Sequence, residues 1–359
     1  MRLPSLDGLR AVSILLVLLA HLRGTGQAPD LAWLSAVGDV GNLGVRTFFV
    51  ISGFLMTMLL ENEYERRGCI SVATFLQRRA FRILPALAAY LVALALMTAI
   101  GIVAVTHSDL LTAATFATNY DAERSWYVGH LWSLSVEAQF YVLWATTRVL
   151  VGRSRMFPVA LAAVAAGPAA RVGIHVLAPE WRWSIGEAFP TVVDALATGS
   201  LLAMMQARLA GSSRYLRLIQ SAAGSAMPLA LLGLNAAMPY IAFSYTIGET
   251  LMNLLLAAII HRVVMFPRSA IGRILNARAA VGLGTLSYSL YLWQQPFLNR
   301  QSTALFAQFP LNLVLAAIAA LLSYFVIERP ALQISAARIK GRARTSYREP
   351  NGRHAHATC

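Results

Sequence analysis

The chain has 359 residues, of which 57% are hydrophobic and only 13% are charged. A soluble globular domain seldom carries so few charges, because it must keep a large surface in water. The composition therefore excludes an ordinary soluble protein and indicates an integral membrane protein. The formal net charge of +14 could suggest a nucleic-acid partner, but the basic residues form short clusters between apolar stretches, so we expect no such partner.

Apolar stretches long enough to cross a membrane recur along the whole chain. A crossing needs roughly 20 mostly apolar residues, and about ten such stretches are separated by breaks that carry Arg, Gly or Pro. In chain order, the expected spans are 9–25, 43–60, 83–105, 130–150, 157–177, 187–207, 217–235, 239–262, 280–299 and 305–327. We therefore predict an all-α polytopic membrane domain over residues 1–330.

The basic residues set the expected orientation. If the N-terminus is cytoplasmic, about 24 of the 30 basic residues face the cytoplasm and about five face outward, as the positive-inside bias requires. The opposite orientation inverts this ratio, so we expect both termini in the cytoplasm. Residues 331–359 then form a basic cytoplasmic tail, for which we expect disorder.

The first expected span carries three titratable residues on one helical face. Asp7 and Arg10 are three residues apart, and Arg10 and His21 are eleven apart, which places these two on one side of a helix, roughly 16 Å apart along its axis. Ionisable residues inside membranes often face interior cavities, so His21 is a candidate catalytic residue. Arg10 could instead be a membrane-surface anchor, with Asp7 as its ion-pair partner.

Several ordered motifs carry a family resemblance. The stretch LDGLRAVSILLVLLAH (6–21), with Arg10 followed eleven residues later by His21, resembles the opening of the acyltransferase family 3 membrane proteins, which are bacterial O-acyltransferases. The likeness continues in GVRTFFVISGFLMT (44–57), FLQRRAFRILPAL (75–87), HLWSLSVEAQFYVLW (130–144), LGTLSYSLYLWQQPF (283–297) and FVIERP (325–330). The resemblance thus covers residues 1–330.

This resemblance implies a function. Members move an acyl group from cytoplasmic acyl-CoA, here with acetyl-CoA as the expected donor, to a sugar hydroxyl of an exported glycan or its lipid-linked precursor. The partners would be acyl-CoA, the glycan or lipid-linked sugar, and the lipids of the bacterial cytoplasmic membrane. His21 would be the general base, because an imidazole titrates near neutral pH. We expect no metal, and the sequence leaves the oligomeric state open.

The donor would be held at the cytoplasmic end. Arg79 and Arg82 lie one helical turn apart in LQRRAFRILPA, at the expected membrane boundary. Guanidinium groups bind phosphate oxygens bidentately, and CoA carries a pyrophosphate and a ribose phosphate. We therefore expect these two residues and Arg10 to bind the acyl-CoA phosphates, with Asp7 orienting Arg10. Plain topological anchoring is the alternative reading.

A carboxylate in the fourth expected span needs a partner or a task. Glu137 lies about 10 Å along the helix from His130, and an unpaired carboxylate there would be costly. We expect Glu137 to share a cavity with His21, either orienting the imidazole or binding sugar hydroxyls; an ion pair with a neighbouring helix is the alternative. His130, between two tryptophans, is expected to be an interfacial anchor.

The acceptor side offers further charged candidates. Arg46 stands where many relatives have an acidic residue, and it could select an anionic acceptor or simply reach the outer headgroups. Asp194 is a second acceptor-side candidate, while the role of Glu249 is left open. The chain also has Gln294 where a large subgroup of relatives has His, which suggests that a histidine at this position is not needed here.

Two other functions remain in view. A transporter would also place buried charges among many spans, but no inverted repeat is evident between the two halves of the chain. The acceptor could also be a small secondary metabolite, such as a macrolide sugar, rather than a glycan.

Overall fold

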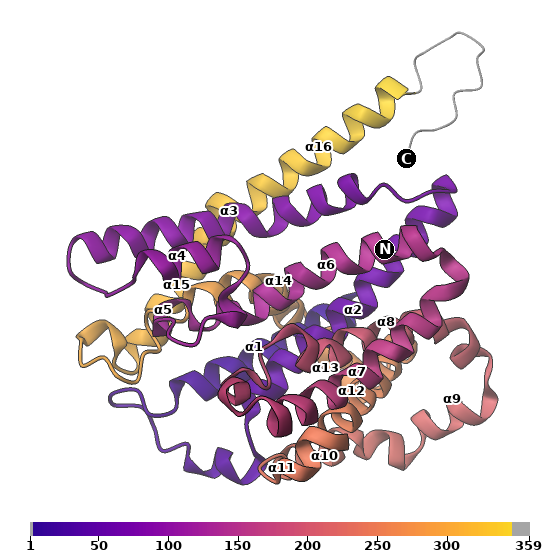
Figure 1. The fold of residues 1–359 in the computed structure, drawn as a ribbon, viewed down its shortest axis with the longest axis horizontal. Coiled ribbons are helices and arrows are strands. Elements are labelled where there is room, and N and C mark those ends of the chain that lie inside the picture. The colour runs from indigo at the N-terminus through magenta and orange to yellow at the C-terminus, as the bar shows by residue number, and fades with distance from the viewer. Residues whose placement is uncertain (1–2, 347–359) are drawn as a thin grey trace.

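The structure is a computed structural model and describes residues 3–346, within which every regular element is helical (Figure 1). The longer helices are α1 (Pro4–Leu22), α2 (Val40–Arg67), α3 (Val72–Ala99), α6 (Leu131–Val151), α7 (Met156–Leu177), α8 (Phe189–Gly211), α10 (Ala222–Ala236), α12 (Glu249–Met265), α14 (Arg278–Trp293), α15 (Leu311–Ser323) and α16 (Arg329–Ser346). Between them lie the shorter α4 (His107–Ala114), α5 (Trp126–Gly129), α9 (Ser213–Gln220), α11 (Ile241–Phe243) and α13 (Ala270–Leu275). Turns of 3-10 helix include η1 (Ala32–Val37) and η4 (Pro179–Ser184), and two π-helical turns, η5 (Ser244–Gly248) and η7 (Tyr324–Glu328), lead into α12 and α16.

Seven helices within residues 3–346 are long and apolar enough to cross a membrane, and α9 with α10, bent by 63° to each other, would provide an eighth. The expected count of ten is therefore not confirmed. Helix α6 is 21 residues long, but its polar residues, among them Glu137 and Arg148, lower its hydropathy. Helix α14 has only 16 residues, because it ends at Trp293 where the expected span continues to residue 299.

The C-terminal segment differs from the expected disordered tail. Helix α16 continues to Ser346, and residues 347–359 lie outside the described part of the chain. Helix α3 runs beside α16 along one side of the molecule (Figure 1). The guanidinium of Arg338 lies 5.3 Å from the ring centroid of Phe81 in α3. Contact with α3 thus supports a helix over residues 331–346 despite their high charge.

Local signals in the sequence explain where several helices begin and end. The carboxylate of Asp39 accepts a hydrogen bond from the backbone N–H of Asn42 at the start of α2, and the hydroxyl of Ser71 caps α3 in the same way through Thr74. Gly68 ends α2 with a φ of 73°, a backbone angle that favours glycine.

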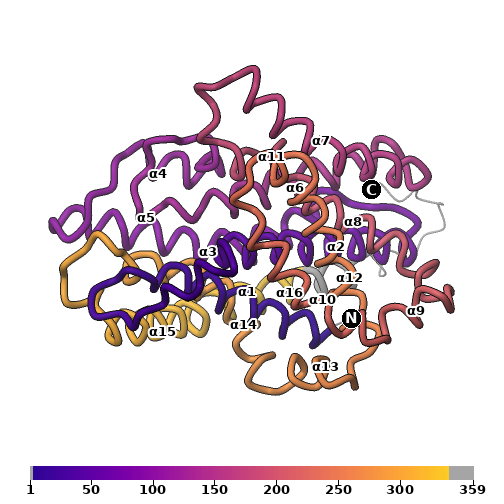
Figure 2. The backbone as a smooth tube through the Cα atoms, turned by 90° about the horizontal axis from the view of Figure 1, so that it is seen from below, coloured from indigo at the N-terminus to yellow at the C-terminus, as the bar shows by residue number. Residues whose placement is uncertain are grey.

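Helix α1 lies at the centre of the arrangement that positions the site. It packs against α2 on one side and α14 on another, and α2 in turn packs against α8. The start of α1 and the end of α16 both lie on the right in Figure 1, and the start of α1 lies right of centre in Figure 2 as well. The connection from α1 through η1 lies at the opposite end of α1.

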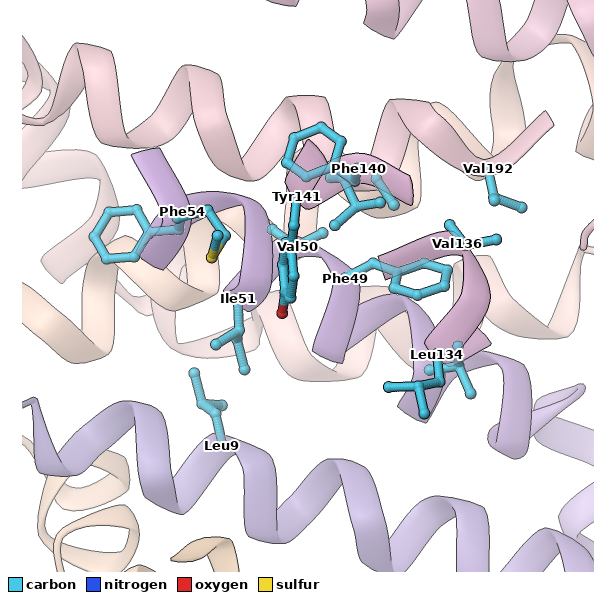
Figure 3. Close-up of a cluster of buried hydrophobic side chains, with 14 of the residues drawn as sticks. Leu9, Phe49, Val50, Ile51, Phe54, Leu134, Val136, Phe140, Tyr141 and Val192 are labelled. Carbon is cyan, nitrogen blue, oxygen red and sulfur yellow. The ribbon is translucent and has the colours of Figure 1, made fainter. Parts of the chain in front are cut away.

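A core of apolar side chains fills the space between α1, α2, α6 and α8 (Figure 3). Leu9 comes from α1, Val50 and Phe54 from α2, Phe140 from α6 and Val192 from α8, and all five are buried. Without a water-driven force between helices in lipid, such close packing is a main source of helix association. This core fixes the turns of α1, α2 and α6 that carry the polar side chains described next.

Candidate active site

Helix α1 presents the three predicted residues in the expected order. Nη1 of Arg10 lies 3.6 Å from Oδ1 of Asp7, so the predicted i, i+3 ion pair is formed. Helix α14 approaches this turn so closely that a Cβ added to Gly284 would lie 1.7 Å from the carbonyl oxygen of Asp7. The absence of a side chain at Gly284 thus allows α14 to set the position of the Asp7 turn.

The structure brings the three predicted arginines together around one cavity. Arg10, Arg79 and Arg82 line a cavity of about 90 Å³ together with Glu137, and we call it the arginine cavity. Its other lining residues, from α2, α3, α6 and α14, are Val45, Phe48, Phe49, Ser52, Leu55, Met56, Ile83, Ser133, Leu134, Tyr141, Ser287, Tyr288 and Tyr291. The sequence-based grouping of these arginines on one site is consistent with this geometry.

The charges of two of these arginines are available to a bound anion. Among residues 3–346, neither Arg79 nor Arg82 forms an ion pair. Nε of Arg79 is buried without a hydrogen-bond partner, and its guanidinium lies 5.8 Å from the ring centroids of both Phe75 and Tyr141. A buried donor without a partner is costly, so a phosphate oxygen at this point would be stabilised.

A second opening reaches the same arginines from the other side. Arg10 and Arg82 also line a cavity of about 320 Å³, together with Asp7 and Glu328. Glu328 ends the π-helical turn η7 and accepts a hydrogen bond of 2.8 Å from Oγ of Ser289. π-helical turns are frequent at functional sites. Arg10, Leu55 and Arg82 line both cavities, so the two spaces are neighbours.

The sequence analysis expected Glu137 to share a cavity with His21, and the structure shows a different arrangement. Its carboxylate accepts hydrogen bonds from the hydroxyls of Ser52 and Tyr141 and lines the arginine cavity, not the cavity that contains His21. The reason is its depth along α6. Glu137 lies about 10 Å further along the chain axis than His130, the N-cap residue of α6, which lines a cavity together with His21.

His21 lines a separate and larger cavity. This histidine cavity has a volume of about 840 Å³ and contains both His21 and His130. Its rim carries Arg23, Asp39, Glu187 and Arg300, which directly follow α1, directly precede α2, precede α8 and follow α14, respectively. Val45 and Tyr291 line this cavity and the arginine cavity alike, so these two side chains separate the two spaces.

A chain of amide groups fixes the tautomer of His21. The backbone carbonyl of Trp126 can only accept, so Nε2 of Gln295 donates to it at 2.8 Å, and Oε1 of Gln295 accepts from Nε2 of Gln294 at 2.9 Å. Oε1 of Gln294 then faces Nδ1 of His21 at 2.8 Å, and this nitrogen must carry the hydrogen. Nε2 of His21 therefore keeps its lone pair, as a general base requires.

Gln294 and His130 are the site residues that the sequence analysis misjudged. Gln294 is fully buried, and its side-chain amide forms a hydrogen bond with His21. It does so although a subgroup of the family has His at this position. His130 is no interfacial anchor, since it is 4% exposed and its ring packs against those of Tyr90 and Tyr291. The sequence signal for both was the same: a polar residue within a motif shared with the family.

Arg46 and Asp194, which the sequence analysis expected at the acceptor side, lie together in a buried cluster of charged residues. Arg46 is 1% exposed and pairs with Glu249, and its Nη1 lies 4.0 Å from Oδ1 of Asp194. Arg171, which the sequence analysis did not single out, completes the cluster with contacts of 3.1 Å to Asp194 and 2.9 Å to Glu249. Position 46 of α2 faces α8 and α12 rather than α1. The two arginines and two carboxylates neutralise one another and line neither cavity.

Comparisons with known proteins agree with this architecture. Residues 3–329 match the family model acyltransferase 3, which is described as an acyltransferase domain. The O-acetyltransferase OatA of Staphylococcus aureus (strain NCTC 8325 / PS 47) is 27% identical over 375 residues, which cover 91% of this chain and 57% of OatA. A protein of S. aureus (strain COL) whose name gives O-acetyltransferase as its expected activity is 36% identical over 159 residues, covering 39% of this chain and 24% of that protein.

This chain therefore spans little more than half the length of OatA. No solved structure gives a significant match. The matched residues nonetheless include α1 with Arg10 and His21, the arginine pair of α3, Glu137 on α6 and the π-helical turn before α16. This chain is a multi-helix membrane protein that belongs to the acyltransferase 3 family.

Proposed function

We propose that the protein is a membrane-embedded O-acyltransferase that moves an acyl group, acetyl in the simplest case, from cytoplasmic acyl-CoA to a sugar hydroxyl of an exported glycan or its lipid-linked precursor. The protein would lie in the bacterial cytoplasmic membrane with both termini in the cytoplasm. The family and the two O-acetyltransferase relatives support acyl transfer. Donor, acceptor and the role of each residue belong to the proposal.

One observation carries the proposal: a single helix, α1, places Arg10 in the arginine cavity and His21 in the histidine cavity. The two positions are eleven residues apart, roughly 16 Å along the axis. The arginine cavity suits phosphate oxygens, whereas the histidine cavity is roomy and polar enough for a sugar. The pantetheine arm of CoA would extend from one cavity into the other past Val45 and Tyr291. At about 90 Å³, the arginine cavity must widen to admit that arm.

The proposed reaction needs one proton carrier. Nε2 of His21 accepts the proton of the acceptor hydroxyl while that oxygen attacks the thioester carbonyl carbon. The carbon–sulfur bond then breaks, and the imidazolium returns its proton to the departing thiolate. Gln294 keeps Nδ1 of His21 protonated throughout, because its Oε1 can only accept. Atoms and charge balance without a metal or a redox step.

The test is acyl transfer by the purified protein in proteoliposomes. Vesicles receive isotope-labelled acetyl-CoA on the side of the termini and oligosaccharide acceptors on the other, and mass spectrometry follows the label. We expect labelled ester on the acceptor with wild type and none with His21→Ala, while that variant still binds CoA. Full turnover by a correctly inserted His21→Ala protein would overturn the role of His21.

The same vesicles separate the other two functions considered above. Passage of the oligosaccharide without any labelled ester would identify a transporter. Labelling of a macrolide sugar in preference to every oligosaccharide would identify modification of a small metabolite. Mass spectrometry of cell-surface glycans with and without the gene gives the corresponding test in cells.

A further inference from the structure

Two arginines at the rim of the histidine cavity have no carboxylate partner within the described part of the chain. Arg23 directly follows α1, and Arg300 follows the end of α14, and both are exposed to the cavity. Among residues 3–346, neither forms an ion pair. A Cβ on Gly24 would lie 4.0 Å from Cβ of Arg300, so the two segments are neighbours. The rim therefore carries two arginines, on neighbouring segments, that form no ion pair within residues 3–346.

Arg300 is held close to the candidate base. Its guanidinium lies 5.6 Å from the ring centroid of Trp126, and that ring meets the imidazole of His21 edge-on with 5.5 Å between centroids. The indole is itself fixed, since its Nε1 donates to the backbone oxygen of Gln295 at 2.9 Å. A cation stacked on an aromatic ring loses less freedom on binding an anion than a free side chain does. Only one ring separates this charge from His21.

The carboxylates at the same rim are already engaged. Glu187 pairs with Arg124, and Asp39 accepts the backbone N–H of Asn42 at the start of α2. Arg124 offsets the charge of Glu187, whereas Asp39 keeps its negative charge, so Arg23 and Arg300 together leave the cavity with a net positive charge. A concave site with an excess of positive charge attracts anionic ligands.

We propose that the histidine cavity takes an acidic acceptor, whose carboxylate or phosphate group binds between Arg23 and Arg300 while its hydroxyl lies at Nε2 of His21. Guanidinium groups bind either oxyanion bidentately. This inference deepens the proposed function and rests on it for the position of the hydroxyl. The anion-binding site itself does not depend on catalysis.

Binding is measured first, with detergent-solubilised protein and without acyl donor. The probes are a hexuronic-acid oligosaccharide, the same oligosaccharide with its carboxyl groups reduced to alcohols, and a neutral oligosaccharide bearing a phosphate. We expect wild type to bind the acidic probes at least about tenfold more tightly than the reduced one. Arg23→Gln and Arg300→Gln should each lose most of this preference. Arg182→Gln is the matched control, since Arg182 is exposed in η4, next to the cavity but not lining it.

Equal binding of the acidic and reduced probes by wild type would overturn the inference. So would an acidic preference that survives both Arg→Gln substitutions in proteins that retain the wild-type melting temperature. Tight binding of only the phosphate probe, or only the uronic acid probe, would identify which oxyanion the site takes.

Turnover with labelled acetyl-CoA then distinguishes this inference from the proposed function. If the acidic preference is present in binding but no acceptor is acetylated, the anion site stands and the proposed function fails. If acidic and neutral acceptors bind and react equally well, the proposed function stands and the anion site fails. If both hold, KM for the acidic acceptor rises about tenfold in Arg23→Gln and Arg300→Gln, and this rise becomes smaller as salt is added. The rise exceeds any change in KM for the neutral acceptor.

Discussion

The amide oxygen of Gln294 accepts the Nδ1 hydrogen of His21 at 2.8 Å, inside a chain of amides that ends at a backbone carbonyl. This contact predicts the effect of removing the acceptor. In Gln294→Leu, the imidazole loses the partner that selects its tautomer, and we expect kcat for acetyl transfer to fall about tenfold, the effect of roughly 1.4 kcal/mol. Gln294→His is the control, because an imidazole can also accept this hydrogen and relatives carry it. Wild-type turnover in Gln294→Leu would contradict the role.

Donor binding gives a second prediction. Arg79→Gln and Arg82→Gln each remove an arginine from the arginine cavity, and we expect the Kd for acyl-CoA to rise about tenfold or more in each, because a hydrogen bond to a charged group contributes about 1.5–3 kcal/mol. Arg78→Gln is the matched control, since Arg78 pairs with Glu63 at 3.0 Å and does not line the cavity. Calorimetry with CoA checks this. Unchanged affinity in both variants would return the pair to a role in membrane orientation.

Glu137 gives a third prediction that separates two readings of its role. Because its carboxylate lies in the arginine cavity and not beside His21, Glu137→Gln should leave the pH at which kcat is half-maximal unchanged. The KM for acyl-CoA should change instead, since the charge balance around the three arginines is altered. A displaced pH profile with an unchanged donor KM would show that Glu137 acts on His21 after all.

The buried cluster around Arg46 predicts a loss of stability rather than of specificity. Arg46→Met leaves Glu249 with one fewer cation in a buried site, and breaking such a pair costs about 3–5 kcal/mol. We expect a lower melting temperature in detergent. The double variant Arg46→Met with Glu249→Gln should be less destabilised than Arg46→Met alone, because it removes one charge of each sign. Normal stability of the single variant, with altered acceptor choice, would favour the acceptor-side role first expected for Arg46.

The crossing of α1 and α14 predicts an effect that reaches the site. A Cβ at position 284 would lie 1.7 Å from the carbonyl oxygen of Asp7, so Gly284→Ala must push the two helices apart, at a cost of about 1–3 kcal/mol. Because Asp7 pairs with Arg10, acyl-CoA binding should weaken as well. Gly282→Ala, on the same helix with nothing within 4 Å of its added Cβ, should change neither property. Equal behaviour of the two variants would contradict the role of this crossing.

Helical periodicity and charge explain which parts of the site could be predicted from the sequence. Arg10 and His21 lie eleven residues apart on one helix, and Arg79 and Arg82 lie three apart on another, so their shared faces follow from 3.6 residues per turn alone. The gathering of these arginines at one end followed from their place at the ends of apolar stretches. Both inferences concern residues that lie on the same helix or at the same depth in the membrane.

Relations between helices could not be predicted in the same way. Whether Glu137 or His130 meets His21 depends on how far α6 is shifted along α1, and periodicity contains no information on that shift. Arg46 turned inward because α2 is rotated towards α8 and α12, where two carboxylates balance it. The expected count of spans is not confirmed partly because apolar length does not say where a helix ends: α14 ends at Trp293, before the buried amides of Gln294 and Gln295.

Helix α1 runs without interruption from Pro4 to Leu22 and therefore fixes the distance between Arg10 and His21. The spacing between its two functional turns is set by peptide geometry, at 1.5 Å per residue, and no hinge in the helix can shorten or lengthen it. One inserted residue between positions 10 and 21 would rotate His21 by about 100° away from Arg10, whereas removal of a whole turn would keep the face but bring the two about 5 Å closer. Under the proposed function, the reach of the donor has to match this fixed length, so the helix would select the donor by size as well as by charge.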